Sequence, residues 1–321
     1  MKKSLKVLSI ATAMILGTTL TIGCSSKEVT KDSEQKKVAL ILSEGGVNDQ
    51  SFNQSAWAGA VKAEEKYNID ANYYESKQES DFATNIETAV DEGNDLIIGV
   101  GFKLTDSIAK AAKAYPEQKF AIIDGSFGDE IPENVVPILF NEEQSGYSVG
   151  LIASKMTKTN KVGFIGGMDI PSVSNFLVGF EKAIKEENPN IEVVSQYANS
   201  FTDAAKGRAI STQMIKNGVD IIFTAGGGVN NGTIETCKEL GKKVIGVDMP
   251  MNYIMTDTII TSALKNVDTG VELIVKDLVE DNYKGGQVKM FDFSNKGVGF
   301  EKSDLIPQDV IEYTESKINN K

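Results

Sequence analysis

Short apolar runs recur along the chain and alternate with longer stretches in which apolar residues are three or four positions apart. The first run, Val-Ala-Leu-Ile-Leu at 38–42, has no polar residue and predicts a strand that is buried on both faces. The stretch at 82–90, with Phe82, Ile86 and Val90 on one side, predicts an amphipathic helix. Further apolar runs lie at 96–98, 120–123, 162–165, 191–194, 221–223, 244–247 and 259–264. Strands and helices alternate almost without exception, which predicts parallel sheets with helices on both sides.

The alternation occurs in two series, which predicts two lobes with an open sheet each. We expect the first lobe at 38–141 with part of 265–300, and the second at 142–264 with part of 301–321. In open parallel sheets, ligands bind beyond the carboxyl ends of the strands. Two such lobes facing each other would therefore place their strand-end loops around one cleft. The predicted fold class is α/β, with two doubly wound parallel-sheet lobes joined by hinge crossings.

The first 23 residues have the layout of a secretory signal peptide. Three lysines within the first six residues precede an apolar stretch that has no acidic residue and is short for a membrane span. Leu20-Thr21-Ile22-Gly23-Cys24 resembles a bacterial lipobox, in which the Cys becomes the acylated first residue, and 24–37 then forms a polar tether. We therefore expect a lipid anchor at Cys24 on the extracytoplasmic face of the cell membrane. The alternative is an ordinary signal peptide that ends beside a Cys by chance.

The net charge and the absence of some residue types limit the classes of function that the chain can have. Without residues 1–23, 30 basic residues remain against 45 acidic ones, so the net charge moves from −12 to −15 and nucleic acid is not expected as a partner. The chain has no His, the usual general base near neutral pH and the commonest transition-metal ligand. Arg208 is the only Arg, and Cys237 is the only thiol besides Cys24, so anion recognition and an intrachain disulfide are disfavoured. These features argue against an enzyme, and we expect no metal and no cofactor.

A polar segment follows the first predicted strand. Gly45 and Gly46 permit a tight turn, and Asn48, Asp49 and Ser51 can cap the helix that comes next. One interpretation is that these residues only cap the helix. A cap needs one such side chain, however, so the cluster also predicts contacts with a ligand.

The segment at 47–59 resembles the opening signature of the basic membrane protein family, lipoproteins similar to the purine nucleoside receptor of spirochaetes. Further motifs follow in family order at 101–102, 115–116, 120–124, 163–168, 171–180, 200–203, 225–227, 245–248 and 261–265. The resemblance covers about 38–276 and implies a type I periplasmic-binding-protein fold that captures a nucleoside for an ABC importer. The segments at 229–231 and 249–252 depart from the family pattern and leave the exact ligand open.

The resemblance also implies the part of the site that holds the base. Phe52 from the first lobe and Phe201 from the second would enclose a purine ring between them. Stacking of a base on an aromatic side chain is worth about 1–3 kcal/mol and tolerates different bases. Asn48, Asp49 and Asn53 would meet the polar edge of the base or the nearby sugar. The alternative for Phe52 is simple packing, and for Asn53 a solvent-facing amide on the helix.

For the sugar, the resemblance implies Asp124, Asp248 and Lys265. Asp124 and Asp248 each follow a predicted strand directly, where a carboxylate can accept hydrogen bonds from two vicinal hydroxyls. Lys265 would hold a ribose oxygen and offset the acidic charge, and the alternative is a structural ion pair between Asp248 and Lys265. Gly227 lies in a glycine run that lacks the Lys and Ser/Thr of a nucleotide loop, so close backbone approach to an uncharged ligand is the preferred interpretation.

The leading hypothesis is a monomeric, lipid-anchored binding protein that captures guanosine, inosine or adenosine and delivers it to an ABC permease. A rival of the same class is a receptor for another uncharged solute, such as a sugar or a flavin. A surface lipoprotein with a role in adhesion or signalling is a further alternative. A nucleoside hydrolase is disfavoured because it needs clustered aspartates near the amino terminus, and 38–60 contains Asp49 alone.

Overall fold

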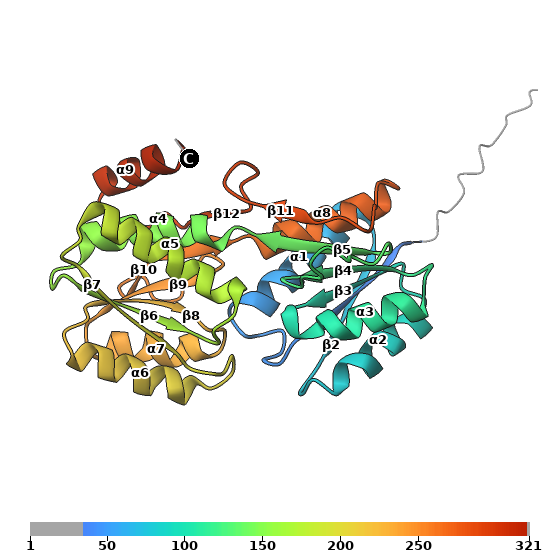
Figure 1. Cartoon of the computed structure of the whole chain (residues 1–321), viewed down its shortest axis with the longest axis horizontal. Helices are drawn as coiled ribbons and strands as arrows, with labels where there is room; N and C mark the ends of the chain where they lie inside the picture. The colour runs from blue at the N-terminus through green and yellow to red at the C-terminus, as the bar shows by residue number, and fades with distance from the viewer. Residues whose placement is uncertain (1–34, 320–321) are drawn as a thin grey trace, which may run out of the picture. The chain divides into compact units, whose positions relative to one another are not determined.

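The computed structural model describes residues 35–319, which belong to one compact unit (Figure 1). The predicted signal peptide, Cys24 and the tether up to residue 34 lie outside the described residues. Between 35 and 319, no helix has the length and apolar character needed to cross a bilayer.

The first lobe is built on a six-stranded sheet in which all neighbouring strands are parallel. Its strands, in sheet order, are β11 (Lys289–Phe291), β5 (Val135–Phe140), β4 (Lys119–Ile123), β3 (Leu96–Val100), β1 (Lys37–Leu42) and β2 (Asp70–Glu75). Helices α1 (Phe52–Tyr67) and α8 (Val267–Val279) cover one face, and α2 (Asp81–Asp91) and α3 (Thr105–Ala114) cover the other. The run at 38–42 is fully buried between these layers, as its lack of polar residues predicts.

The second lobe repeats this plan. Its strands, in sheet order, are β12 (Val298–Phe300), β10 (Ile259–Lys265), β9 (Lys243–Asp248), β8 (Ile221–Ala225), β6 (Lys161–Gly166) and β7 (Glu192–Tyr197). Only β12 runs antiparallel to its neighbour. Helices α4 (Glu142–Met156), α5 (Pro171–Glu187) and α9 (Gln308–Ile318) pack on one face, and α6 (Ala204–Lys216) and α7 (Val229–Glu239) on the other. Two parallel-sheet α/β lobes are what the alternation of strands and helices predicts.

Within residues 35–319, the chain passes between the lobes three times. It crosses from β5 to α4, from β10 to α8, and from β11 to β12. Glu142 is the first residue of α4 and Lys265 the last residue of β10, so both lie at crossings. Side chains at these positions can contact both lobes.

Strand β2 does not coincide with any of the apolar runs that predict strands. Its sequence, Asp-Ala-Asn-Tyr-Tyr-Glu, is mostly polar because β2 is an edge strand that pairs only with β1. Edge strands are partly solvated and need no continuous apolar run.

Candidate functional site

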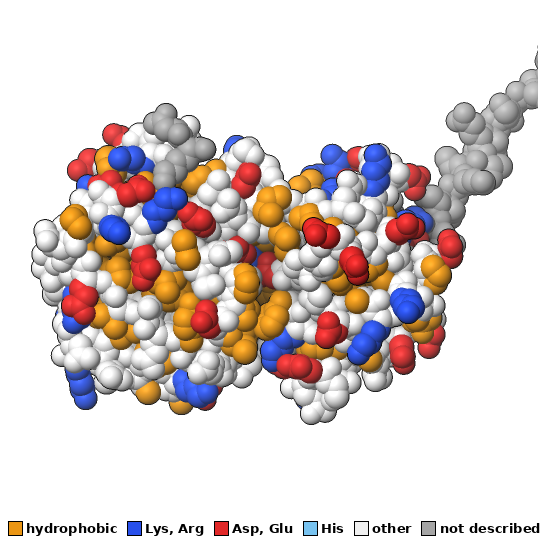
Figure 2. Space-filling model, in the orientation of Figure 1, with side chains coloured by type: hydrophobic (Ala, Val, Ile, Leu, Met, Phe, Trp, Pro, Cys, Tyr) orange, Lys and Arg blue, Asp and Glu red, His pale blue; other side chains and the backbone are white. Residues whose placement is uncertain are grey.

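A cavity of about 90 Å³ lies between the two lobes. The first lobe contributes Ser43, Glu44, Asp49, Phe52, Asn53, Gly101, Phe102, Lys103 and Asp124 to its wall. The second contributes Ile170, Ser172, Val173, Phe176, Phe201, Ala225, Gly227, Val247, Asp248 and Lys265. Most of these residues follow the carboxyl end of a parallel strand, where open sheets bind their ligands. Figure 2 shows hydrophobic side chains gathered along the junction of the lobes.

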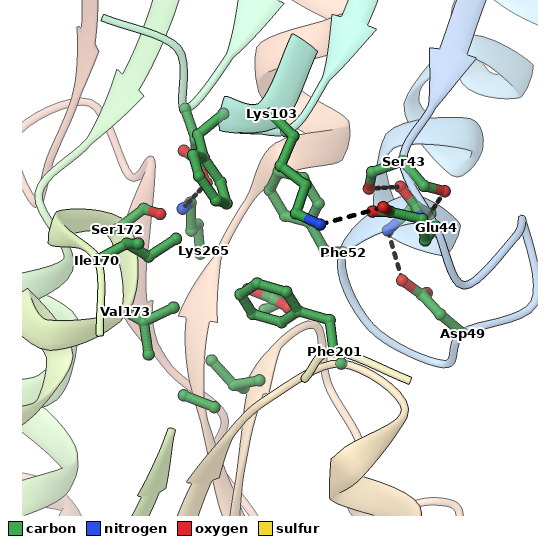
Figure 3. A pocket seen from close by; sticks show the side chains of 18 of the residues that line it. Ser43, Glu44, Asp49, Phe52, Lys103, Ile170, Ser172, Val173, Phe201 and Lys265 are labelled. Atoms are coloured by element: carbon green, nitrogen blue, oxygen red, sulfur yellow. Dashed lines mark hydrogen bonds and ion pairs between the residues drawn. The ribbon is translucent and has the colours of Figure 1, made fainter. Parts of the chain in front are cut away.

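Phe52 and Phe201 border the cavity from opposite lobes (Figure 3). Phe52 is the first residue of α1 and packs against the core of the first lobe, whereas Phe201, between β7 and α6, packs against the core of the second. No ring contact joins the two side chains in the described part of the chain, whose six aromatic pairs involve other rings. The two rings therefore flank the cavity without stacking on each other.

Two glycines lie so close to Phe201 that a side chain at either position would clash with it. A Cβ at Gly167 would lie 2.4 Å from Cε1 of Phe201, and a Cβ at Gly227 would lie 2.9 Å from its carbonyl oxygen. Gly227 also has a left-handed φ of 58°, which side chains other than Asn and Asp rarely tolerate. The glycine run after β8 thus lets its loop lie against the backbone of Phe201.

Lys265 forms the centre of a buried ionic cluster. Its side chain is 2% exposed, and its Nζ lies 2.5 Å from Oδ2 of Asp124 and 2.9 Å from Oε1 of Glu142. The rings of Phe52 and Phe140 lie 5.4 Å and 5.3 Å from the same ammonium. Burial alone would lower the pKa of Lys265, but the charges of Asp124 and Glu142 outweigh it and raise the pKa. The ammonium therefore stays charged and joins an acid of the first lobe to one at a hinge crossing.

The two predicted sugar-binding aspartates lie at strand ends of different lobes, and both have a left-handed backbone conformation. Asp124, after β4, has φ 62°, and Asp248, the last residue of β9, has φ 67°. Burial raises the pKa of Asp124 to about 7 and that of Asp248 to about 6, although Lys265 opposes both shifts. Oδ1 of Asp124 is buried and has no hydrogen-bond partner among the described residues. An unpaired carboxylate oxygen at the cavity can accept a hydrogen bond from a ligand hydroxyl.

Ser51 links the lobes directly. Its hydroxyl donates to Oδ2 of Asp248, and both side chains are buried. The alternative pairing of Asp248 with Lys265 is not what the structure contains, because Lys265 bonds Asp124 and Glu142 instead. Ser51 also makes no side-chain cap of α1, so its hydroxyl is free for this interlobe bond.

The three residues predicted for the base edge have different environments. Asp49 accepts the backbone N–H groups of Ser51, Asn53 and Gln54 and therefore caps α1, as the alternative interpretation held, while still lining the cavity. Asn53 is 1% exposed and pairs with Ser43 at 3.1 Å, so the interpretation as a solvent-facing amide is wrong. Asn48 is exposed and does not line the cavity, so its contact with a ligand stays a prediction. The turn that directs Asp49 towards the helix leaves its neighbour in solvent.

The sequence argument missed several residues of the site. Glu142, which bonds Lys265 but does not itself line the cavity, comes two residues after β5 ends at Phe140, so the rule applied to other strand ends could have found it. Lys103 follows β3 and lies in the 3₁₀ turn Phe102–Leu104. Ile170 and Val173, at the start of α5, add an apolar side to the cavity, and no local signal separates them from core residues.

Comparisons with known proteins agree with this architecture. The family model of the PnrA-like ABC transporter substrate-binding proteins matches residues 36–321. The chain is 37% identical to the CD4+ T-cell-stimulating antigen of Listeria monocytogenes, over 97% of this chain and 94% of that protein. It is 33% identical to the ABC transporter nucleoside-binding protein BmpA of Lactococcus lactis, over 93% of this chain and 91% of that protein. A solved ABC transporter solute-binding protein from Aeropyrum pernix K1 superposes with a TM-score of 0.77 at 29% identity, over 89% and 86% of the two chains, and confirms the predicted type I fold.

Proposed function

The chain belongs to the Bmp family of PnrA-like ABC transporter substrate-binding proteins, and from this premise we propose that it captures a purine nucleoside between its lobes for delivery to an ABC permease. The observation that carries the proposal is that the cavity wall combines aromatic rings with buried charged groups. Two aromatic rings from opposite lobes line it, and so do two buried acids and the ammonium of Lys265. The name of the Lactococcus relative, a nucleoside-binding protein, supports the same ligand class.

The aromatic pair suits a flat heterocycle. Phe52 and Phe201 come from different lobes, so a base between them would contact both lobes only when the cleft is closed. Each stacked ring would contribute about 1–3 kcal/mol. Ligand binding would thereby favour the closed form, because only that form offers both rings.

The ionic cluster suits a pentose. Asp124 has an unpaired buried oxygen, and Asp248 keeps one oxygen besides the one bonded to Ser51. Lys265 uses two of its three N–H groups in hydrogen bonds to acids, which leaves one donor. Together they offer acceptors for vicinal hydroxyls and one donor for a ring or hydroxyl oxygen. A ligand that lacks a hydroxyl here would leave a buried carboxylate oxygen unpaired.

Isothermal titration calorimetry tests the proposal directly. The purified chain, freed of any bound solute by unfolding and refolding, should bind at least one of guanosine, inosine and adenosine with micromolar or lower Kd. The matching 2′-deoxynucleosides should bind more weakly, because the acids lose a partner. Failure of all three ribonucleosides to bind would refute the nucleoside proposal, and binding of free ribose alone would favour a sugar receptor instead.

We also propose that the protein acts as a monomer tethered through an acylated Cys24 on the extracytoplasmic side of the membrane. This residue lies outside the described residues, and the proposal depends on the sequence around it. Cys24→Ser should move the protein from the membrane fraction to the medium or periplasm, detected by immunoblotting. Retention of the variant in the membrane fraction would contradict lipid anchoring.

A further inference from the structure

An ion pair forms part of the cavity wall away from Lys265. Nζ of Lys103 lies 3.0 Å from Oε1 of Glu44 and 2.9 Å from Oε1 of Glu79. Lys103 and Glu44 both line the cavity, and their side chains are only 23% and 24% exposed. In the view of Figure 3, Lys103 crosses the Phe52 ring and extends towards Glu44, which lies on the side opposite Lys265.

The pair has hydrogen-bonding capacity left over. An ammonium has three donors, and Glu44 and Glu79 occupy two of those of Lys103. Oε2 of Glu44 has no hydrogen bond within residues 35–319. Burial alone would lower the pKa of Lys103, but hydrogen bonds to Glu79 and Glu44 raise it, so the side chain keeps its charge. The wall therefore presents one charged donor beside one charged acceptor.

Two of the residues predicted to meet the base already make hydrogen bonds within the protein. Asp49 accepts the backbone N–H groups of Ser51, Asn53 and Gln54. Asn53 exchanges hydrogen bonds with Ser43. If the pentose occupies the Lys265 cluster and the base lies between the rings, the far edge of the base faces Lys103 and Glu44. This orientation rests on the function proposed above.

We propose that Lys103 and Glu44 read the edge of the base and select nucleosides whose base carries a carbonyl beside a ring N–H, as in hypoxanthine and guanine. The carbonyl oxygen extends about 1.23 Å beyond the ring and accepts from the Lys103 ammonium. The adjacent ring N–H donates to Oε2 of Glu44, and guanine adds an amino group for the same carboxylate. Adenine in this orientation places an amino donor against the ammonium and a ring acceptor against the carboxylate, so both contacts are mismatched.

The experiment compares affinity ratios by calorimetry on the purified, refolded chain. Inosine and guanosine should bind at least about tenfold more tightly than adenosine, because charged hydrogen bonds are gained in one case and lost in the other. Lys103→Met should weaken inosine binding about tenfold and bring the inosine-to-adenosine ratio near one. Glu44→Gln, whose amide can donate as well as accept, should improve adenosine relative to inosine. Lys77→Met is the matched control, because Lys77 is exposed in the adjoining groove but does not line the cavity.

A ratio of affinities is insensitive to a general loss of stability, so partial unfolding of a variant does not imitate the expected result. Equal affinities for inosine and adenosine in the unaltered protein, or an unchanged ratio in Lys103→Met, would overturn the role of the pair while leaving nucleoside capture intact. Absence of binding by every nucleoside would instead defeat the proposed function and this inference with it.

Discussion

Replacement of Lys265 by Met should destabilise the protein strongly. The ammonium is almost fully buried and neutralises Asp124 and Glu142, which are themselves 7% and 5% exposed in their side chains. Methionine has a similar length but no charge, so two acids would remain in a poorly solvated site. Removal of one partner from a buried ion pair typically costs about 3–5 kcal/mol. That loss corresponds to a decrease in Tm of roughly 5–15 °C for a chain of this size.

The loss should depend on pH in a defined direction. The pKa of Asp124 is raised to about 7 by burial, while Lys265 is the main influence that lowers it, so its pKa rises further in Lys265→Met. Below about pH 7, Asp124 is protonated in both proteins and needs no counter-charge. The difference in unfolding free energy should therefore be larger at pH 8.5 than at pH 5.5.

Urea unfolding measures this difference. Circular dichroism follows both lobes, and the fluorescence of Trp57, the single Trp, follows the first. Lys62→Met is the control, because Lys62 pairs with Asp268 at the surface with 55% of its side chain exposed and should cost less than about 1 kcal/mol. Addition of Asp124→Asn and Glu142→Gln to Lys265→Met should restore much of the stability. A cost below about 1 kcal/mol at pH 8.5, or an equal cost at both pH values, would refute the reasoning.

Three further predictions concern the cleft. Ser51→Ala removes the hydroxyl bonded to Asp248 across the lobes, so nucleoside should dissociate about tenfold faster in stopped-flow experiments, and an unchanged rate would count against an interlobe latch. Phe201→Ala removes one ring from the cavity wall and should weaken binding by about 1–3 kcal/mol in calorimetry, whereas full affinity would exclude stacking on this side. In the ligand-free protein, burial raises the pKa of Asp124 from 3.8 to about 7 and that of Asp248 from 3.8 to about 6, so the folded state holds protons that the unfolded state releases. The contribution of these two acids to stability should be fully present below about pH 4, fall as pH rises to about 7 and level off above it, and a rise across that range in denaturant midpoints would contradict the assignment.

The spacing of apolar residues was enough to predict the two-lobed α/β fold. A strand buried on both faces needs an uninterrupted apolar run and a covering helix needs an apolar face, and both requirements are local in the sequence. The resemblance to the family then implied Asp124, Asp248 and Lys265, which lie at strand ends and all line the cavity. Edge strand β2 was missed because solvation of its outer side removes the apolar signal.

Only the tertiary structure decided which of these groups meet. Lys265 bonds Asp124, 141 positions away, and Ser51 bonds Asp248, 197 positions away, so no local pattern could reveal either contact. The same holds for Asn48, which lies in solvent although its neighbour Asp49 turns inward to cap α1. The physical reason is that composition and periodicity determine which residues are buried, whereas the partner of each buried polar group depends on how the two sheets are placed relative to each other.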